Sequence, residues 1–160
     1  MNSHNKISTK TIARIAAIQL IYRYKLEEPP PNVNLLMQQL IKFYQEERSI
    51  YNSNKSIKVK FSISYFEALV KCVVLKLSQI DDIIMKYLTS EWQITNLPIL
   101  LLALLRVATC ELLYFPQVPK KVVINEFTDI GSDMVNDNEV AFINSILDNI
   151  AKNSEIKYGS

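Results

Sequence analysis

Apolar residues recur at helical spacing through most of this chain. Between about residues 9 and 25 they follow one another at intervals of three and four, which predicts an amphipathic helix. Three consecutive prolines, residues 29–31, end that helix because proline cannot continue it. The stripe expected to face the core consists of Ile12, Ile15, Ala16, Gln19 and Tyr22.

The same period predicts five further helices, at about residues 34–48, 64–88, 97–114, 119–134 and 137–150. The 64–88 helix is longer than is usual in globular proteins, so we expect it to bend or break near Ser78. Asn96 is the expected N-cap of the next helix, with Pro98 in its first turn. The polar stretch 49–60 indicates a loop, and the tail from residue 155 is expected to fray.

Composition supports an all-α fold. Of 160 residues, 49% are hydrophobic and 21% charged, as in globular proteins, and a β-sandwich would need more than the two glycines present. Arg106 and Glu111 interrupt the apolar run 97–115, and its uncharged part is too short to cross a bilayer. Cys72 and Cys110 follow no disulfide or metal-binding spacing, which indicates unpaired cysteines and a reducing cytoplasm; the polar amino terminus lacks a signal peptide.

Nothing in the sequence favours catalysis. The one histidine, His4, lies in a polar tail, and neither cysteine has a histidine that would activate it. Asp81 and Asp82 are adjacent on a helix and point about 100° apart, a poor arrangement for two ligands of one metal. No glycine-rich phosphate loop is present. We therefore predict no catalytic residue, no cofactor and no metal site.

Three polar residues lie within apolar helical stretches: Gln19, Arg106 and Glu111. Arg106 and Glu111 are five residues apart, which places their side chains about 140° apart on a helix and prevents a simple pair. Since an unpaired buried charge is costly, each needs a partner on another element. The interpretation we prefer is structural, in which these residues fix how helices dock.

Charge is distributed unevenly along the chain. Residues 1–26 carry five cations and no acid, whereas residues 122–150 carry six acids and no Lys or Arg. Lys6, Lys10 and Arg14 are spaced by four and share one helix face near a positive helix N-terminus, which suits a phosphate chain. Three loop cations could extend this site or simply be solvated: Lys55, Lys58 and Lys60.

Three motifs, read in order, resemble the NusB family. The stretch ARIAAIQLIY at 13–22 resembles the family's opening "AR…A.QaLY". LLRVATCELLYFPQVPKKVVINE at 104–126 and AFINSILDNI at 141–150 resemble its two later motifs. Trp92 and Leu97 also stand where the family often has these residues.

The resemblance implies two small helical bundles packed together, a half at about 9–88 and a half at about 96–152, in one RNA-binding domain. It implies a cytoplasmic transcription antitermination adaptor that binds boxA-type single-stranded RNA with the ribosomal protein NusE and joins the RNA polymerase antitermination complex on rRNA genes. It places RNA contacts at Lys10 and Arg14, with Lys6 upstream, and at Asn138 and Phe142. Asn125 and Glu126, in the family's "INE" motif, join the structural polar set.

Two departures from the family pattern change these expectations. Thr11 and Ile12 occupy places where relatives often have arginines, which predicts a weaker grip on RNA. The apolar run 99–105 covers all sides of a helix, so it is either buried all round or presents a patch to a partner. We expect Leu101 or Leu102 to be partly exposed and, with Tyr87, to contact the partner.

Two other functions stay open at this point. One is a protein-only scaffold or homodimer with little RNA affinity, consistent with the thinned basic stripe. The other is the RNA-binding accessory domain of an rRNA methyltransferase; it is disfavoured because no glycine-rich methyl-donor domain follows before Ser160.

Overall fold

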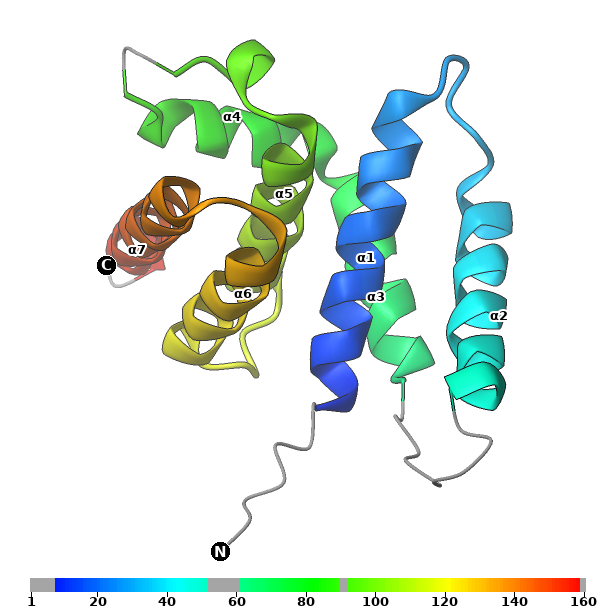
Figure 1. Cartoon of the computed structure of the whole chain (residues 1–160). Helices are drawn as coiled ribbons and strands as arrows, with labels where there is room; N and C mark the ends of the chain where they lie inside the picture. Colours follow the sequence, from blue (N-terminus) through cyan, green and yellow to red (C-terminus); the bar gives the residue numbers. More distant parts are fainter. Residues whose placement is uncertain (1–7, 52–60, 90–91, 159–160) are drawn as a thin grey trace, which may run out of the picture. The chain divides into compact units, whose positions relative to one another are not determined.

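The computed structural model describes residues 8–51, 61–89 and 92–158, with only the backbone described for 46–51 and 155–158. Within these ranges the chain holds α-helices and one short 3-10 helix, so the all-α prediction is confirmed (Figure 1). In chain order they are α1 (Thr9–Leu26), α2 (Val33–Tyr51), α3 (Ile63–Leu75), α4 (Leu77–Tyr87), η1 (Ile94–Asn96), α5 (Ile99–Tyr114), α6 (Lys120–Met134) and α7 (Asp137–Tyr158).

The predicted long helix is broken, as expected, between α3 and α4 at Lys76. The chain divides into two compact units, Met1–Ala68 and Leu69–Ser160, so the division falls inside α3. The sequence interpretation had placed it later, between residues 88 and 96.

In the first unit α1 and α2 run antiparallel and side by side (Figure 1). The start of α3 is tied to the start of α1, because the Ser62 N–H donates to the Thr9 carbonyl at 3.3 Å. The buried face of α1 differs from the predicted stripe: Gln19 and Tyr22 are exposed. The buried residues are instead Ala13, Arg14, Ala16, Ala17, Ile18, Leu20 and Ile21.

The physical reason for that wrong stripe is the composition of α1. Its alanines and isoleucines lie on several sides of the helix, so the pattern fits more than one stripe. The buried face is the one that carries the small residues Ala13, Ala16 and Ala17, which allow neighbouring elements to approach closely.

In the second unit α5 is the central helix. It contacts α4, α6 and α7, and every residue from Leu101 to Leu112 is buried. Leu101 is 1% exposed and Leu102 is 8% exposed, so the prediction that one of them forms an accessible patch was wrong. Surrounding helices cover the all-round apolar surface that the sequence showed, which is the alternative the pattern left open.

Two helix ends differ from the sequence expectation. Asn96 ends η1 rather than capping α5, which begins after Pro98 without a side-chain cap. The last helix continues to Tyr158, beyond the expected end near residue 150.

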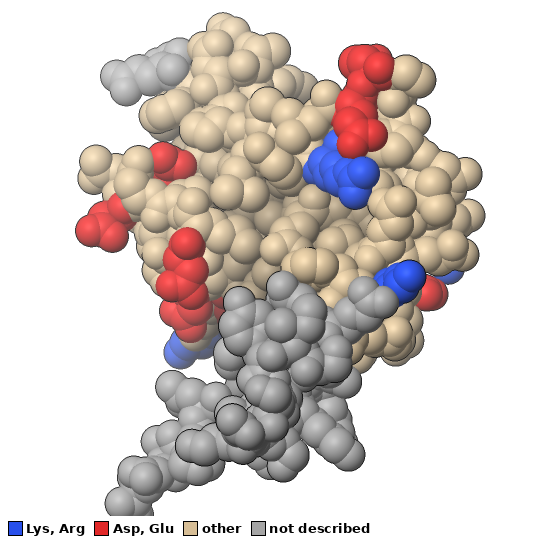
Figure 2. Space-filling view, turned by 45° about the vertical axis from the view of Figure 1, so that its right-hand side comes forward, with Lys and Arg blue, Asp and Glu red and all other residues tan. Residues whose placement is uncertain are grey.

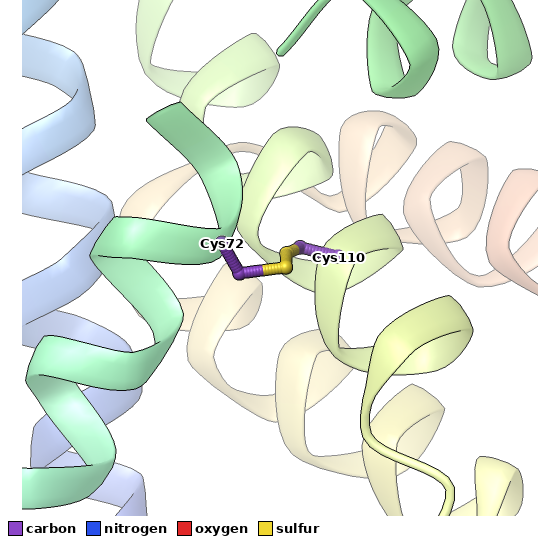
Figure 3. Close-up of a disulfide and its surroundings, with 2 residues drawn as sticks. All are labelled: Cys72 and Cys110. Carbon is purple, nitrogen blue, oxygen red and sulfur yellow. A yellow bond between two sulfur atoms is a disulfide. The ribbon is translucent and has the colours of Figure 1, made fainter. Parts of the chain in front are cut away.

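The two cysteines form a disulfide between α3 and α5 (Figure 3), which corrects the expectation that they are unpaired. Their Cα atoms are 6.6 Å apart although 38 positions separate them in sequence. Sequence spacing could not indicate this pairing, because it depends on how α3 lies beside α5. Among the described helices, none has the length and hydropathy needed to cross a membrane.

Candidate nucleic-acid interface

The start of α1 is built as a helix N-terminus with positive potential. Ser8 is the N-cap, and its hydroxyl accepts from the Lys10 N–H at 3.2 Å. The first turn contains no acidic residue, so no carboxylate there offsets the partial positive charge of the helix N-terminus. Lys10 lies in this turn and is exposed.

Two predicted RNA contacts converge on one aromatic ring. The Lys10 Nζ lies 5.0 Å from the centre of the Tyr65 ring, and the Arg14 guanidinium carbon lies 5.6 Å from it. Tyr65 belongs to the first turns of α3, three residues after Ser62, whose backbone is bonded to Thr9. The structure thus brings Lys10 and Arg14 together, with Tyr65 as a member of the site that the sequence had not indicated.

Arg14 does not face solvent as the predicted basic stripe requires. It is only 2% exposed, so its guanidinium lies within the protein, close to Tyr65. The stripe was inferred from spacing alone, and spacing does not reveal how much of a helix its neighbours cover. Lys6, at the other end of the stripe, and the loop cations Lys55, Lys58 and Lys60 lie outside the described residues.

Further along α1 the positive charge is partly compensated. The Arg23 Nε lies 3.0 Å from a carboxylate oxygen of Glu27, and an Arg23 Nη donates to Gln39 at 3.2 Å. On the face drawn in Figure 2, Lys and Arg atoms occur in separate small groups, each close to acidic atoms. Of the cations predicted to bind phosphate, Lys10 is therefore the one that the described structure places at the surface.

The second predicted region, the start of α7, has a different chemistry. The Asn136 side chain accepts from the Glu139 N–H at 2.9 Å and donates to the Glu139 carboxylate at 2.6 Å, a reciprocal cap. Asn138 is exposed in this first turn, between the acids Asp137 and Glu139. Two carboxylates repel phosphate, so this helix start suits contacts to bases better than contacts to the backbone of a nucleic acid.

Phe142 follows one turn later and is half-buried. Its ring lies 6.0 Å from that of Trp92, centre to centre, and Trp92 is 41% exposed. A pocket of about 280 Å³ next to Trp92 is lined by Met85, Leu88, Gln93, Ile94 and Thr95. The sequence interpretation assigned Phe142 to the site but used Trp92 only as a family marker.

The structure shows partners for two of the polar residues that were expected to fix how helices dock. Arg106 is buried and binds the Asp81 carboxylate on α4 through two hydrogen bonds, 2.8 Å from Nε and 2.9 Å from a terminal nitrogen. This confirms that Arg106 has its partner on another element. Glu111 is fully buried, and the Gln19 side chain accepts from the Tyr44 hydroxyl of α2 at 2.6 Å.

The remaining predicted residues have less defined settings. Asn125 is exposed and Glu126 is half-buried on α6. Tyr87, at the end of α4, is half-buried, and the Lys86 Nζ lies 5.8 Å from its ring centre. Leu101 and Leu102 are covered, so Tyr87 alone of the three predicted partner residues offers surface. Within the described ranges, His, Cys, Asp and Glu form no group of three or more that could hold a metal ion.

Comparison with known proteins decides the family. The NusB family model matches residues 11–152. The chain belongs to the NusB family. Transcription antitermination protein NusB of Rickettsia massiliae is 48% identical over 150 residues, which cover 94% of this chain and 96% of that protein. The Rickettsia bellii protein of the same name is 46% identical over 156 residues, 98% of each chain.

Solved structures of NusB proteins share the fold of this NusB-family chain. NusB of T. maritima superposes with a TM-score of 0.68 at 28% identity, covering 89% of this chain and 90% of that one. A crystal structure of antitermination factors NusB and NusE in complex with double-stranded RNA gives a TM-score of 0.72 at 22% identity, covering 90% and 96%. The resemblance read from the three sequence motifs is thereby confirmed.

Proposed function

We propose that this NusB-family chain is a transcription antitermination adaptor in the cytoplasm that binds boxA-type RNA together with the ribosomal protein NusE and supports rRNA transcription. The observation that carries the proposal is identity of 48% to a transcription antitermination protein along 94% of the chain. A structural relative that contains NusB, NusE and RNA supports the choice of partners. The proposal needs no catalytic residue, cofactor or metal.

Within this proposal Lys10 is the primary phosphate contact, because it is exposed in a first turn without acids. Asn138 and Phe142 contact bases, since acids flank Asn138 and the half-buried Phe142 is an aromatic residue of a kind on which bases stack. Arg14 acts from within the protein beside Tyr65, and Lys6 extends the phosphate contact upstream. Tyr87 is the proposed partner contact.

The test is a binding titration with fluorescein-labelled single-stranded RNA that carries boxA, or the same bases in scrambled order. Each titration is run with and without purified NusE, at several salt concentrations. We expect the parent protein with NusE to prefer boxA over the scrambled RNA. Lys10→Glu should weaken binding of both RNAs and reduce the magnitude of the log–log salt slope by about 0.7 or more, the value for one lost phosphate contact on a single strand. Lys25→Glu, at the other end of the same helix, is the matched control and should change binding less.

A second function is favoured by one observation, the burial of Arg14, which leaves a sparse basic surface at the start of α1. A protein-only scaffold or homodimer would not need such a surface. If the parent chain binds NusE, or forms a dimer on size-exclusion chromatography, but binds neither RNA with or without NusE, the RNA-binding proposal is wrong and the scaffold is supported.

A further inference from the structure

Tyr65 lies where the two cations at the start of α1 meet. Its ring centre is 5.0 Å from the Lys10 ammonium nitrogen and 5.6 Å from the Arg14 guanidinium carbon. Both distances are within the range in which a cation is attracted to the negative face of an aromatic ring. One ring on α3 therefore contacts two like charges on α1.

The Tyr65 ring also counteracts the repulsion between two like charges on α1. Lys10 and Arg14 are four residues apart on a helix, and like charges at that spacing repel each other. A long lysine side chain in that position would otherwise turn away into solvent and sample many rotamers. An aromatic ring attracts both cations without neutralising either, because it carries no net charge.

The backbone holds this ring in place relative to α1. The Ser62 N–H donates to the Thr9 carbonyl at 3.3 Å, and the Phe66 N–H donates to the Ser62 carbonyl at 3.0 Å. Phe66, the neighbour of Tyr65, is fully buried and packs against Phe61 at 5.3 Å between ring centres. The start of α3 is thus anchored on both sides of Tyr65, next to the first turn of α1.

We propose that Tyr65 is a positioning residue for RNA binding: its ring holds the Lys10 ammonium at the start of α1, where a phosphate can bind it. This inference rests on the proposed RNA-binding function and assigns Tyr65 no direct contact with RNA. The ring restricts Lys10 before RNA arrives, which reduces the entropy lost on binding. Among the described residues few cations are exposed at this helix start, so RNA binding depends strongly on the placement of each one.

The experiment measures binding of the fluorescein-labelled boxA RNA, in the presence of NusE, by four proteins: the parent, Tyr65→Leu, Lys10→Gln and the double variant. We expect Tyr65→Leu to bind about three- to tenfold more weakly, as expected for a lost cation–π contact of intermediate exposure. In the Lys10→Gln background the same Tyr65→Leu change should have no further effect. Tyr65→Phe keeps the ring and should bind as the parent does.

A second measurement does not depend on whether Tyr65→Leu folds. Protons of the Lys10 ε-methylene group should show an upfield ring-current shift in NMR spectra of the parent protein. Lys25, an exposed lysine at the other end of α1, is the reference within the same helix. Absence of the shift would mean that Lys10 does not lie over the ring, and the inference would fail.

The possible outcomes separate this inference from the function on which it rests. If the parent does not bind RNA at all, the proposed function fails. If the parent binds and Tyr65→Leu binds equally well, the positioning role alone is overturned. It is also overturned if Tyr65→Leu weakens binding equally with and without Lys10, because Tyr65 would then contact RNA itself. If Tyr65→Phe weakens RNA binding as much as Tyr65→Leu does, the effect comes from the hydroxyl group. The proposed role of the ring would then be wrong.

Discussion

Two arginines of the described structure are buried, and their settings differ. Arg106 on α5 meets the Asp81 carboxylate through two hydrogen bonds of 2.8 and 2.9 Å. Arg14 on α1 lies beside the ring of Tyr65, which it shares with the exposed Lys10. A carboxylate cancels the charge of its partner, whereas the ring beside Lys10 has no charge of its own. The α5 cation therefore serves helix docking, while the exposed Lys10 keeps a positive charge at the start of α1 where a ligand can reach it.

The largest expected loss of stability in the α5 region follows from breaking the disulfide. Reduction of the bond between Cys72 and Cys110 opens a loop of 38 residues, which should lower the free energy of unfolding by about 3 to 4 kcal/mol in the chain-entropy model. The measurement is urea unfolding with and without dithiothreitol. The control is Cys72→Ser, whose stability should not respond to the reductant. A change below about 1 kcal/mol in the parent would show that α3 and α5 hold together without the bond.

The second-largest loss of stability is expected from breaking the ion pair on α5. Asp81→Asn leaves Arg106 charged, buried and poorly paired, which should cost about 2 to 4 kcal/mol, less than for a fully buried pair because Asp81 retains some exposure. The neighbouring Asp82 is exposed, so Asp82→Asn is the matched control and should change stability by about 0.5 kcal/mol or less. Both are measured by urea unfolding.

A double variant tests whether the unpaired charge causes that loss of stability. Replacing both partners with apolar residues, Arg106→Met with Asp81→Leu, should recover much of the lost stability, because no buried charge is left unpaired. If the double variant is as unstable as Asp81→Asn, the cost comes from lost packing rather than from the charge, and the contrast with α1 would lose its electrostatic basis.

The sequence predicted these two regions unequally. For α5 it showed an all-round apolar helix and a cation that needed a partner elsewhere, and both were found. It could not name Asp81, because the partner lies on α4 and the match depends on how the helices pack. The expected accessible patch at Leu101 and Leu102 was wrong for the same reason: the helices that cover them come from other parts of the chain.

For α1 the pattern was ambiguous from the start. Alanine and isoleucine lie on several sides of this helix, so periodicity allowed a core stripe through Gln19, which is exposed, and a surface stripe through Arg14, which is buried. The candidate site was therefore predicted only in part. Lys10 was indicated by the absence of nearby acids, whereas Tyr65 belongs to a helix more than fifty positions away, and no local signal connects the two.

A smaller effect is expected at the start of α7, which carries the other proposed RNA contacts. Asn136→Ala removes both hydrogen bonds of the reciprocal cap with Glu139 and should cost about 1 kcal/mol. The amide of Glu139 should also exchange its hydrogen faster. Asn138→Ala is the matched control, since Asn138 is exposed in the same turn and should leave stability nearly unchanged. Equal stability losses in both variants would contradict the assignment of the cap to Asn136.

The smallest expected loss of stability is in α1. Gln19→Ala removes the hydrogen bond from the Tyr44 hydroxyl, but both groups can turn to water because Gln19 is exposed. Alanine also has the better helix propensity, so the net cost should be about 0.5 kcal/mol or less. Urea unfolding of Gln19→Ala beside Asp81→Asn tests this directly. A loss above about 2 kcal/mol would mean that Gln19 is a buried docking residue like Arg106. The face of α1 described here would then be wrong, and the placement of Lys10 next to Tyr65 would lose its support.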